Sequence, residues 1–461
     1  MYRRFIVKKK WDRTKNMHQK RNFLDPPKTL VLGFAIIILL GTICLTLPAA
    51  TTNGHGLSFL NAMFTATSAT CVTGLVVVDT GTTFTLFGQL VILFMIQVGG
   101  LGFMTFATLF AFLLGKRISL KERILLQESL NNLSMEGVVR LARRILVFTA
   151  VIEFVGALIL SIRFSLDMPL GTAIYFGIFH SISNFNNAGF DIIGHFQSLT
   201  GYVSDPTVVL TICALIIIGG IGFIVMNELF EFRRSKRLSL HTKIVLITTS
   251  FLLIVGTLGI FLFEYSNEKT LRPLSFSGKI LGALFQSVAA RTDGANTLNI
   301  AEMTQSSLLL IVFLMFVGAS PGSTGGGIKT TTFTTLLGAV WSQIRGKEDV
   351  IFYRQRIEYE TIYKALTVSF SALFLVLIIT LLLTITEQGT DFLKLLFEAT
   401  SAFGTVGLSM DLSRDLSPLG KMLITFTMFA GRVGPLTIAY AVTMRRNPDA
   451  FRYPKGKIMI G

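Results

Sequence analysis

Four short stretches of the chain end an apolar run with a glycine, and the first of them shows what such a stretch can do. Phe59–Ala69 is an apolar run of eleven residues that leads into Thr70–Gly74. As a helix it would be about 16 Å long, roughly half of a bilayer's hydrocarbon core. Non-helical backbone at membrane depth must be buried in protein or line water. The stretch therefore predicts a half-helix followed by an extended pore loop, whose carbonyl oxygens are available to a cation.

The same pattern recurs at Ile174–Asp191, Ile280–Gly294 and Lys394–Asp411. Each stretch has an aromatic residue near its start and a glycine nine or ten residues later. The four glycines lie 115, 105 and 113 residues apart, at Gly74, Gly189, Gly294 and Gly407. Four half-helices around one axis would point C-terminal ends with partial negative charge at it. That arrangement favours a dehydrated cation over an anion.

We predict that the four loops form a selectivity filter. A lone glycine would equally be a turn after a buried half-helix, but four at repeat spacing favour close backbone approach to an ion. The candidate ion-binding residues are Thr70, Cys71, Val72, Thr73, Gly74, Asn186, Asn187, Ala188, Gly189, Arg291, Thr292, Asp293, Gly294, Gly404, Thr405, Val406 and Gly407.

Several charged residues lie close to these loops. Arg291 is three residues before a filter glycine, where an unpaired charge is costly. We expect it to point away from the ion and to brace the loop, against an acid such as Asp293. Asp79, Asp191 and Asp411 lie just beyond three of the filters. They either raise the cation concentration at the mouth or are ordinary loop acids.

The stretch Gly318–Lys329, GASPGSTGGGIK, interrupts an apolar span. It fails the nucleotide-binding pattern GxxxxGK[ST], because Ile328 separates Gly327 from Lys329, and no strand precedes it. We predict a movable gate, with a static helix kink as the alternative. Arg432, inside the last span, is either a cation barrier or gate partner, or an arginine paired for packing. The candidate gate residues are Gly318, Gly322, Ser323, Thr324, Gly325, Gly326, Gly327, Lys329 and Arg432.

Composition indicates a polytopic membrane protein. Of the 461 residues, 51% are hydrophobic and only 15% are charged, against about 25% in soluble proteins. The net charge of +16 does not indicate nucleic-acid binding, because 32 of the 42 Lys and Arg residues lie in five clusters between apolar segments. This positive-inside pattern predicts that both termini are cytoplasmic. The three cysteines and five histidines are scattered, which predicts neither an enzyme nor a transition-metal site nor a disulfide framework.

The expected fold is all-α: four span–pore-loop–span repeats around one pore, with eight transmembrane helices and four re-entrant half-helices. The matching pentamers GGLGF and GGIGF, starting at Gly99 and Gly219, support the repeat. We expect the helices carrying them, Leu86–Leu114 and Thr207–Phe230, to run straight through the membrane, and the fourth to return along Leu419–Met444. The chain divides into a basic tail (1–28), repeat 1 (29–115), a linker with repeat 2 (116–232), repeat 3 with the gate loop 318–329 (233–342), a linker with repeat 4 (343–446) and a C-terminal tail (447–461).

Four span–pore–span units in one chain, with one glycine in each filter, resemble the Trk/Ktr/HKT superfamily of potassium transporters. Within it, the chain is most similar to the membrane subunit of the bacterial Ktr system. The resemblance implies potassium selectivity over sodium, a homodimer with one pore per subunit, and a cytosolic nucleotide-binding regulatory ring, so that nucleotide acts only through that partner. It also implies a bacterial cell-membrane location and a gate at the glycine-rich break. Only the fourth filter, Thr405–Gly407, matches part of the potassium-channel signature TVGYG.

Two alternatives stay open at this point. A passive potassium pathway and sodium-dependent uptake, with Na⁺ as an activator, are not distinguished by the sequence. A secondary transporter of another small solute would also use broken helices at the membrane midplane. Rubidium uptake into liposomes, with and without competing solutes, separates this second alternative from potassium transport.

Overall fold

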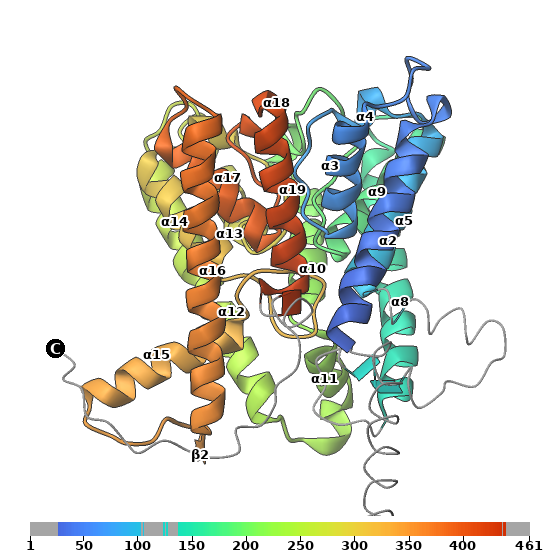
Figure 1. Ribbon diagram of the computed structural model, residues 1–461. Helices are drawn as coiled ribbons and strands as arrows, with labels where there is room; N and C mark the ends of the chain where they lie inside the picture. The colour runs from blue at the N-terminus through green and yellow to red at the C-terminus, as the bar shows by residue number, and fades with distance from the viewer. Residues whose placement is uncertain are drawn as a thin grey trace, which may run out of the picture.

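The computed structural model describes residues 26–102, 105, 123–124, 126–127, 137–435 and 437–438. Within these residues, one succession of elements occurs four times: a long helix, a short helix and a returning helix (Figure 1). Residues 1–25 and 447–461 of the predicted tails lie outside the described residues. So do the predicted span ends 106–114 and 439–444.

The four long helices run along the height of the bundle and are long and apolar enough to cross a membrane. They match the four first spans expected from the sequence. Large apolar side chains remain exposed on them, such as Phe154 (69%) and Phe370 (68%), as expected of surfaces that face lipid. The helices are α2 (Pro26–Thr46), α8 (Val138–Phe164), α12 (Leu240–Glu264) and α16 (Tyr359–Thr386).

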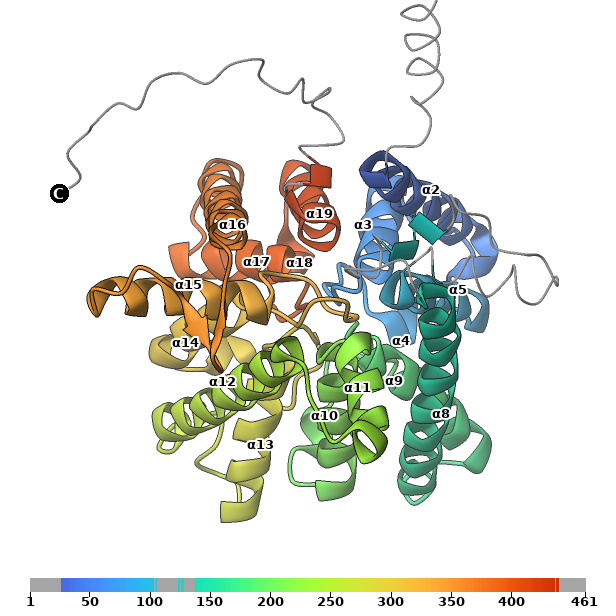
Figure 2. The same ribbon diagram turned by 90° about the horizontal axis from the view of Figure 1, so that it is seen from below.

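The four short helices are the expected half-helices. They have 12 to 16 residues, which gives lengths of about 18–24 Å and falls short of a full crossing. Seen from below, they surround the centre of the bundle (Figure 2), and their C-terminal halves are buried. They are α3 (Phe59–Thr70), α9 (Leu170–Phe185), α13 (Phe276–Ala289) and α17 (Phe392–Gly404).

The returning helices do not run straight through the membrane, so that expectation was wrong. The third glycine of each GGxGF pentamer has a positive φ, 78° at Gly102 and 97° at Gly222, and this left-handed conformation cannot continue an α-helix. In repeat 1 the helix α5 (Leu86–Leu101) ends there. In repeat 2, α10 (Pro206–Gly220) and α11 (Phe223–Ser235) meet at 100°.

The returning helices of repeats 3 and 4 also break, at positions equivalent to the pentamers of repeats 1 and 2. In repeat 4, α19 (Pro418–Val433) ends before Gly434, whose φ is 91°. In repeat 3, residues 317–329 separate α14 (Gln305–Phe316) from α15 (Thr330–Ile344), which projects from the lower part of the bundle (Figure 1). A small antiparallel hairpin that the sequence did not predict, β1 (Ile351–Phe352) and β2 (Gln355–Arg356), follows α15.

The buried core closes the four repeats into a ring. One buried cluster joins residues of repeats 1, 2 and 4, including Phe64, Phe179 and Phe403. Two others join repeat 2 to repeat 3 and repeat 3 to repeat 4. Because the first repeat packs against the last, the C-terminal ends of the half-helices are enclosed by protein.

Glycines of the returning helices allow these helices to touch the ends of the half-helices. A β-carbon on Gly99 would collide with the carbonyl oxygen of Thr70, the last residue of α3, and one on Gly219 with that of Phe185, the last residue of α9. Gly431 lies in the same way against the carbonyl oxygen of Phe403. The glycines therefore set the depth at which each filter loop begins.

We predict that Gly219→Ala destabilises the protein, because its new β-carbon also lies 2.6 Å from Oδ1 of Asn187. Overpacking of this kind costs about 1–3 kcal/mol. Thermal unfolding in detergent should show a lower midpoint for this variant. Gly171→Ala is the control, since a β-carbon there meets nothing within 4 Å. Equal midpoints for the two variants would contradict the packing argument.

Candidate ion pathway

Two residues before each filter glycine, the backbone turns into the left-handed region. The φ angles are 58° at Val72, 60° at Asn187, 96° at Thr292 and 49° at Thr405. Residues with a β-carbon rarely adopt this conformation, so four in equivalent positions mark a shared, strained turn. Three of the glycines that follow also have positive φ, whereas Gly294 does not. The loops thus share a backbone conformation despite different sequences, and the third loop is a variant of it.

In the first and fourth loops, a serine six residues before the glycine anchors the loop to its half-helix. The amides of Gly74 and Gly407 donate to the hydroxyls of Ser68 and Ser401, each at 3.1 Å. The preceding amide in each loop donates to the carbonyl oxygen of the same serine, at 2.8 and 2.9 Å. Because N–H and C=O of a trans peptide point in opposite directions, the carbonyl oxygens of these peptides turn away from the half-helix. The sequence reasoning missed these serines, although their spacing from the glycines is regular.

The filter glycines contact one another across the loops. A β-carbon on Gly74 would collide with the carbonyl oxygen of Ala188, and one on Gly189 with the amide nitrogen of Gly294. One on Gly294 would lie 3.0 Å from Cα of Gly407, and one on Gly407 would lie 2.9 Å from Cα of Gly74. The four loops therefore meet in chain order around one point, where a side chain has no room.

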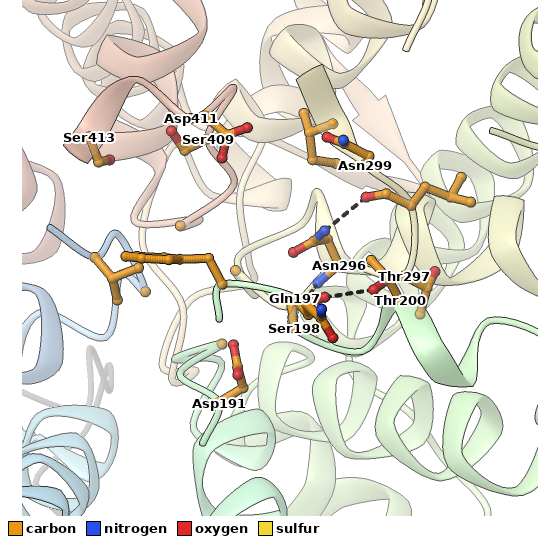
Figure 3. A pocket seen from close by; sticks show the side chains of 18 of the residues that line it. Asp191, Gln197, Ser198, Thr200, Asn296, Thr297, Asn299, Ser409, Asp411 and Ser413 are labelled. Carbon is orange, nitrogen blue, oxygen red and sulfur yellow. Dashed lines mark hydrogen bonds between the residues drawn. The ribbon is translucent and has the colours of Figure 1, made fainter. Parts of the chain in front are cut away.

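A cavity of about 480 Å³ opens at this meeting point, lined by all four glycines and by Asp79, Asp191 and Asp411 (Figure 3). Asp79 accepts hydrogen bonds from the amides of Thr82 and Phe196, at 3.0 and 3.1 Å. Asp191 accepts a hydrogen bond from the amide of Ile193 at 3.2 Å. We name this cavity the outer vestibule.

The third aspartate is paired. Asp411 forms an ion pair with Arg414 at 2.8 Å, and the Arg414 guanidinium lies 3.6 Å from the ring centre of Phe196. All three aspartates thus face the vestibule, and each also holds loop structure. These contacts are those of loop acids, and an effect on the cation concentration at the mouth stays a prediction.

The candidate gate segment lies directly against the filter loops. Thr324 donates its hydroxyl hydrogen to Oδ1 of Asn187 at 2.7 Å, and Asn187 donates to the Thr292 hydroxyl at 3.1 Å. A β-carbon on Gly325 would collide with the Thr292 side chain, and one on Gly326 with that of Thr405. Glycine at these positions lets the segment pack immediately beside the turns that precede the filter glycines.

Backbone hydrogen bonds join the segment to the broken helix of repeat 2. The amide of Ser320 donates to the carbonyl of Gly220 at 3.0 Å, and that of Phe223 to Gly322 at 2.8 Å. The first residue of α11 therefore bonds to the middle of the segment. These bonds satisfy backbone groups that both breaks would otherwise leave unpaired inside the membrane.

Lys329 and Arg432 both donate to carbonyl oxygens in the middle of the gate segment. Lys329 donates to the carbonyl oxygen of Gly325 at 2.8 Å. Arg432 donates to the carbonyl oxygens of Thr324, Gly99 and Gly100, the last at 3.2 Å. Arg432 thus joins the end of α19 to the end of α5 and to the segment, which fits both a gate partner and an arginine paired for packing.

Arg291 does not pair with Asp293. Its Nη2 instead donates to the carbonyl oxygen of Gly318, at 3.1 Å, at the start of the gate segment. A carbonyl at a helix end carries partial negative charge and can take the place of a carboxylate. The expectation that Arg291 braces its loop from behind fits this position, but the partner expected for it was wrong. Asp293 is fully buried, and neither carboxylate oxygen has a hydrogen-bond partner among the described residues.

One further cluster was missed by the sequence reasoning. The Asn186 side-chain amide donates to Gln97 at 2.9 Å and to Glu153 at 3.0 Å. This joins the end of α9 to α5 and α8. An acidic residue within an apolar span is the signal that would have singled out Glu153. Among the described residues, no group of three or more His, Cys, Asp or Glu side chains is placed to hold a metal ion.

Comparison with known proteins agrees with this architecture. The TrkH family model, described as cation transport protein, matches residues 1–452. The chain is 46% identical to Ktr system potassium uptake protein B of Bacillus subtilis, over 95% of this chain and 97% of that one. It is 38% identical to the potassium/sodium uptake protein NtpJ of Enterococcus hirae, over 96% and 98%.

A solved structure shares the fold. The crystal structure of the potassium transporter TrkH from Vibrio parahaemolyticus matches with a TM-score of 0.70 at 18% identity, covering 90% of this chain and 83% of that one. The apolar helices make the chain a multi-pass membrane protein, and its relatives are transporters rather than enzymes. The chain belongs to the TrkH family of cation transport proteins.

Proposed function

We propose that this protein takes up potassium across the bacterial cell membrane through the four filter loops. The observation that carries the proposal is the meeting of Gly74, Gly189, Gly294 and Gly407 at the floor of one vestibule. The relatives named as potassium uptake proteins support the choice of ion. Sodium as an activator or second cargo is part of the proposal, supported by the name of NtpJ.

The filter would work by replacing water with backbone oxygen. Loop amides bonded to the half-helices leave carbonyl oxygens free for the ion. The C-terminal ends of the four half-helices add partial negative charge at the same point. Since each loop keeps one glycine, the stack of carbonyl rings is shorter than in a TVGYG filter. We therefore expect fewer ordered ion sites and a lower preference for potassium over sodium.

We propose that residues 318–329 close the pathway below the filter. The segment is buried beside three filter loops through Asn187, Thr292 and Thr405, and Lys329 and Arg432 bring positive charge to it. A cation leaving the filter would meet both the segment and these charges. Withdrawing the segment would need movement of α15, which begins at its end.

The remaining elements of the proposal concern assembly and orientation. We propose a homodimer with one pore per subunit, cytoplasmic termini, and control by a cytosolic nucleotide-binding ring docked on the basic face. The clustering of Lys and Arg between apolar segments supports this orientation. The projecting α15 directly follows the gate segment, so a partner that binds α15 could move the segment (Figure 1).

The first prediction concerns Gly→Ser at each filter glycine. At Gly74, Gly189 and Gly407 we expect loss of potassium transport or of its preference over sodium, because φ is positive and the β-carbon meets backbone. At Gly294 we expect the mildest effect, since φ is not positive there. Rubidium and sodium uptake into liposomes measures both the transport rate and the preference for potassium over sodium. Wild-type selectivity in all four variants would show that these loops are not the filter. Displacement of rubidium by an uncharged or larger solute would instead favour the other transporter class.

The second prediction concerns Arg432→Ala, which removes three hydrogen bonds to carbonyl oxygens from the gate segment and α5. We expect potassium flux without the partner to rise, with potassium-over-sodium preference unchanged. Deletion of Gly322–Gly327 should act in the same direction. The control is Lys421→Ala, a cation on the same helix that bonds Asn61 instead. A flux equal to wild type in folded Arg432→Ala would remove Arg432 from the gate, and the same result in the folded deletion variant would reduce the segment to a static kink.

The third prediction concerns regulation. The described cytoplasmic elements carry no nucleotide-binding pattern, so the purified subunit alone should transport potassium with no response to added nucleotide. Addition of a nucleotide-binding ring protein from a Ktr system should make the flux respond. The measurement is rubidium uptake with and without ATP or ADP. A nucleotide response of the isolated subunit would contradict this arrangement.

A further inference from the structure

The fourth half-helix contains a buried carboxylate that the pathway described above does not use. Glu398 lies on α17, nine residues before Gly407, and is fully buried. Glu398 directly follows the phenylalanine that the half-helices share, and the equivalent positions in the other three are Thr65, His180 and Gln286. A carboxylate at this depth is therefore peculiar to the fourth repeat.

Both oxygens of this carboxylate accept hydrogen bonds from serines beyond the filter. Ser409 donates to Oε2 at 2.8 Å, and Ser413 donates to Oε1. Within the described residues, no Lys, Arg or His nitrogen lies within 4 Å of Glu398. When ionised, it is thus stabilised by hydroxyl groups alone and its negative charge is not cancelled by a neighbouring cation.

The two serines belong to the wall of the outer vestibule. Ser409 and Ser413 line the cavity on either side of Asp411 (Figure 3). Each hydroxyl has one hydrogen, and here that hydrogen is committed to Glu398. The serine oxygens can therefore act towards the vestibule only as acceptors, which is the polarity that a cation losing its water requires.

The same contacts fix the chain that leaves the fourth filter. The Ser409 hydroxyl also accepts the amide of Leu412, at 3.2 Å. Asp411, between them, has a φ of 63°, a conformation that costs energy for a residue with a β-carbon. Through Ser409 and Ser413, Glu398 thus holds the strained turn that follows Gly407.

We propose that Glu398 is a positioning residue for cation capture at the outer end of the fourth filter loop. It sets the Ser409 and Ser413 oxygens as acceptors and supplies negative charge behind the place where a cation enters the filter. The inference rests on the proposed function, because it assumes that the cation passes Gly407.

The experiment compares Glu398→Gln with Glu398→Asp, using rubidium uptake into liposomes by the full-length protein over a range of rubidium concentrations. The Gln variant keeps the size of the side chain but loses the charge and turns one acceptor into a donor. We expect its half-saturating rubidium concentration to rise by roughly three- to tenfold, since one nearby charge is lost. Glu398→Asp should recover part of this loss. Ser409→Ala should shift the half-saturating concentration in the same direction, and its effect should not add to that of Glu398→Gln.

The matched control is Glu387→Gln. Glu387 also accepts hydrogen bonds from a serine, Ser417, through its hydroxyl at 2.6 Å and its amide at 3.1 Å. It lies at the end of α16 and does not line the vestibule. We expect the half-saturating rubidium concentration of Glu387→Gln to equal that of the wild type, so a general effect of neutralising a partly buried, serine-bonded acid is separated from the proposed one.

Gly407→Ser is measured in parallel to separate two failures. If Gly407→Ser changes selectivity and Glu398→Gln leaves the half-saturating concentration unchanged, the inference fails and the proposed filter stands. If neither variant changes transport, the proposed filter fails as well. If Glu398→Gln lowers only the thermal midpoint or the maximal rate, Glu398 is a structural residue and the inference is overturned.

Discussion

Every backbone amide and carbonyl at membrane depth needs a partner, and this requirement governs the rest of the structure. Four half-helices end inside the bundle, and four returning helices break there as well. In hydrocarbon, each unpaired backbone group costs several kcal/mol. The repeats therefore cannot stand alone, and they close into a ring in which the loops bond to serines, to neighbouring loops and to the broken helices.

Glycine makes this closure possible in two different ways. In the returning helices, Gly99 and Gly219 remove the side chain that would separate a helix from the end of a half-helix. At Gly102 and Gly222, glycine supplies the positive φ that ends or bends the helix. One pentamer thus combines close packing against the end of a half-helix with a break in the returning helix.

The filter and the gate segment are parts of a single hydrogen-bonded unit. Asn187 bonds both to Thr292 of the next loop and to Thr324 of the segment, while Arg432 bonds the carbonyl of Thr324. The cations here are balanced by carbonyl oxygens at helix ends rather than by carboxylates. Such pairing is weaker than an ion pair and leaves net positive charge, which fits the gate that we propose at this segment.

The sequence by itself determined the class of protein, the four long helices, the four half-helices and the positions of the four glycines. These follow from hydrophobic run length and from spacing, which are local properties of the chain. It also pointed to Arg432 and to residues 318–329, because charge and glycine within an apolar span are conspicuous.

Only the tertiary structure decided what these residues touch. The bend at Gly222, the bond from Arg291 to Gly318 and the bonds from Glu398 to Ser409 and Ser413 all depend on which elements the ring brings together. A GGxGF pentamer is compatible with a straight or a bent helix until a neighbouring segment supplies partners for the freed backbone groups. Contacts between residues 27 positions apart, such as Arg291 and Gly318, are set by packing, and neither periodicity nor spacing carries that information.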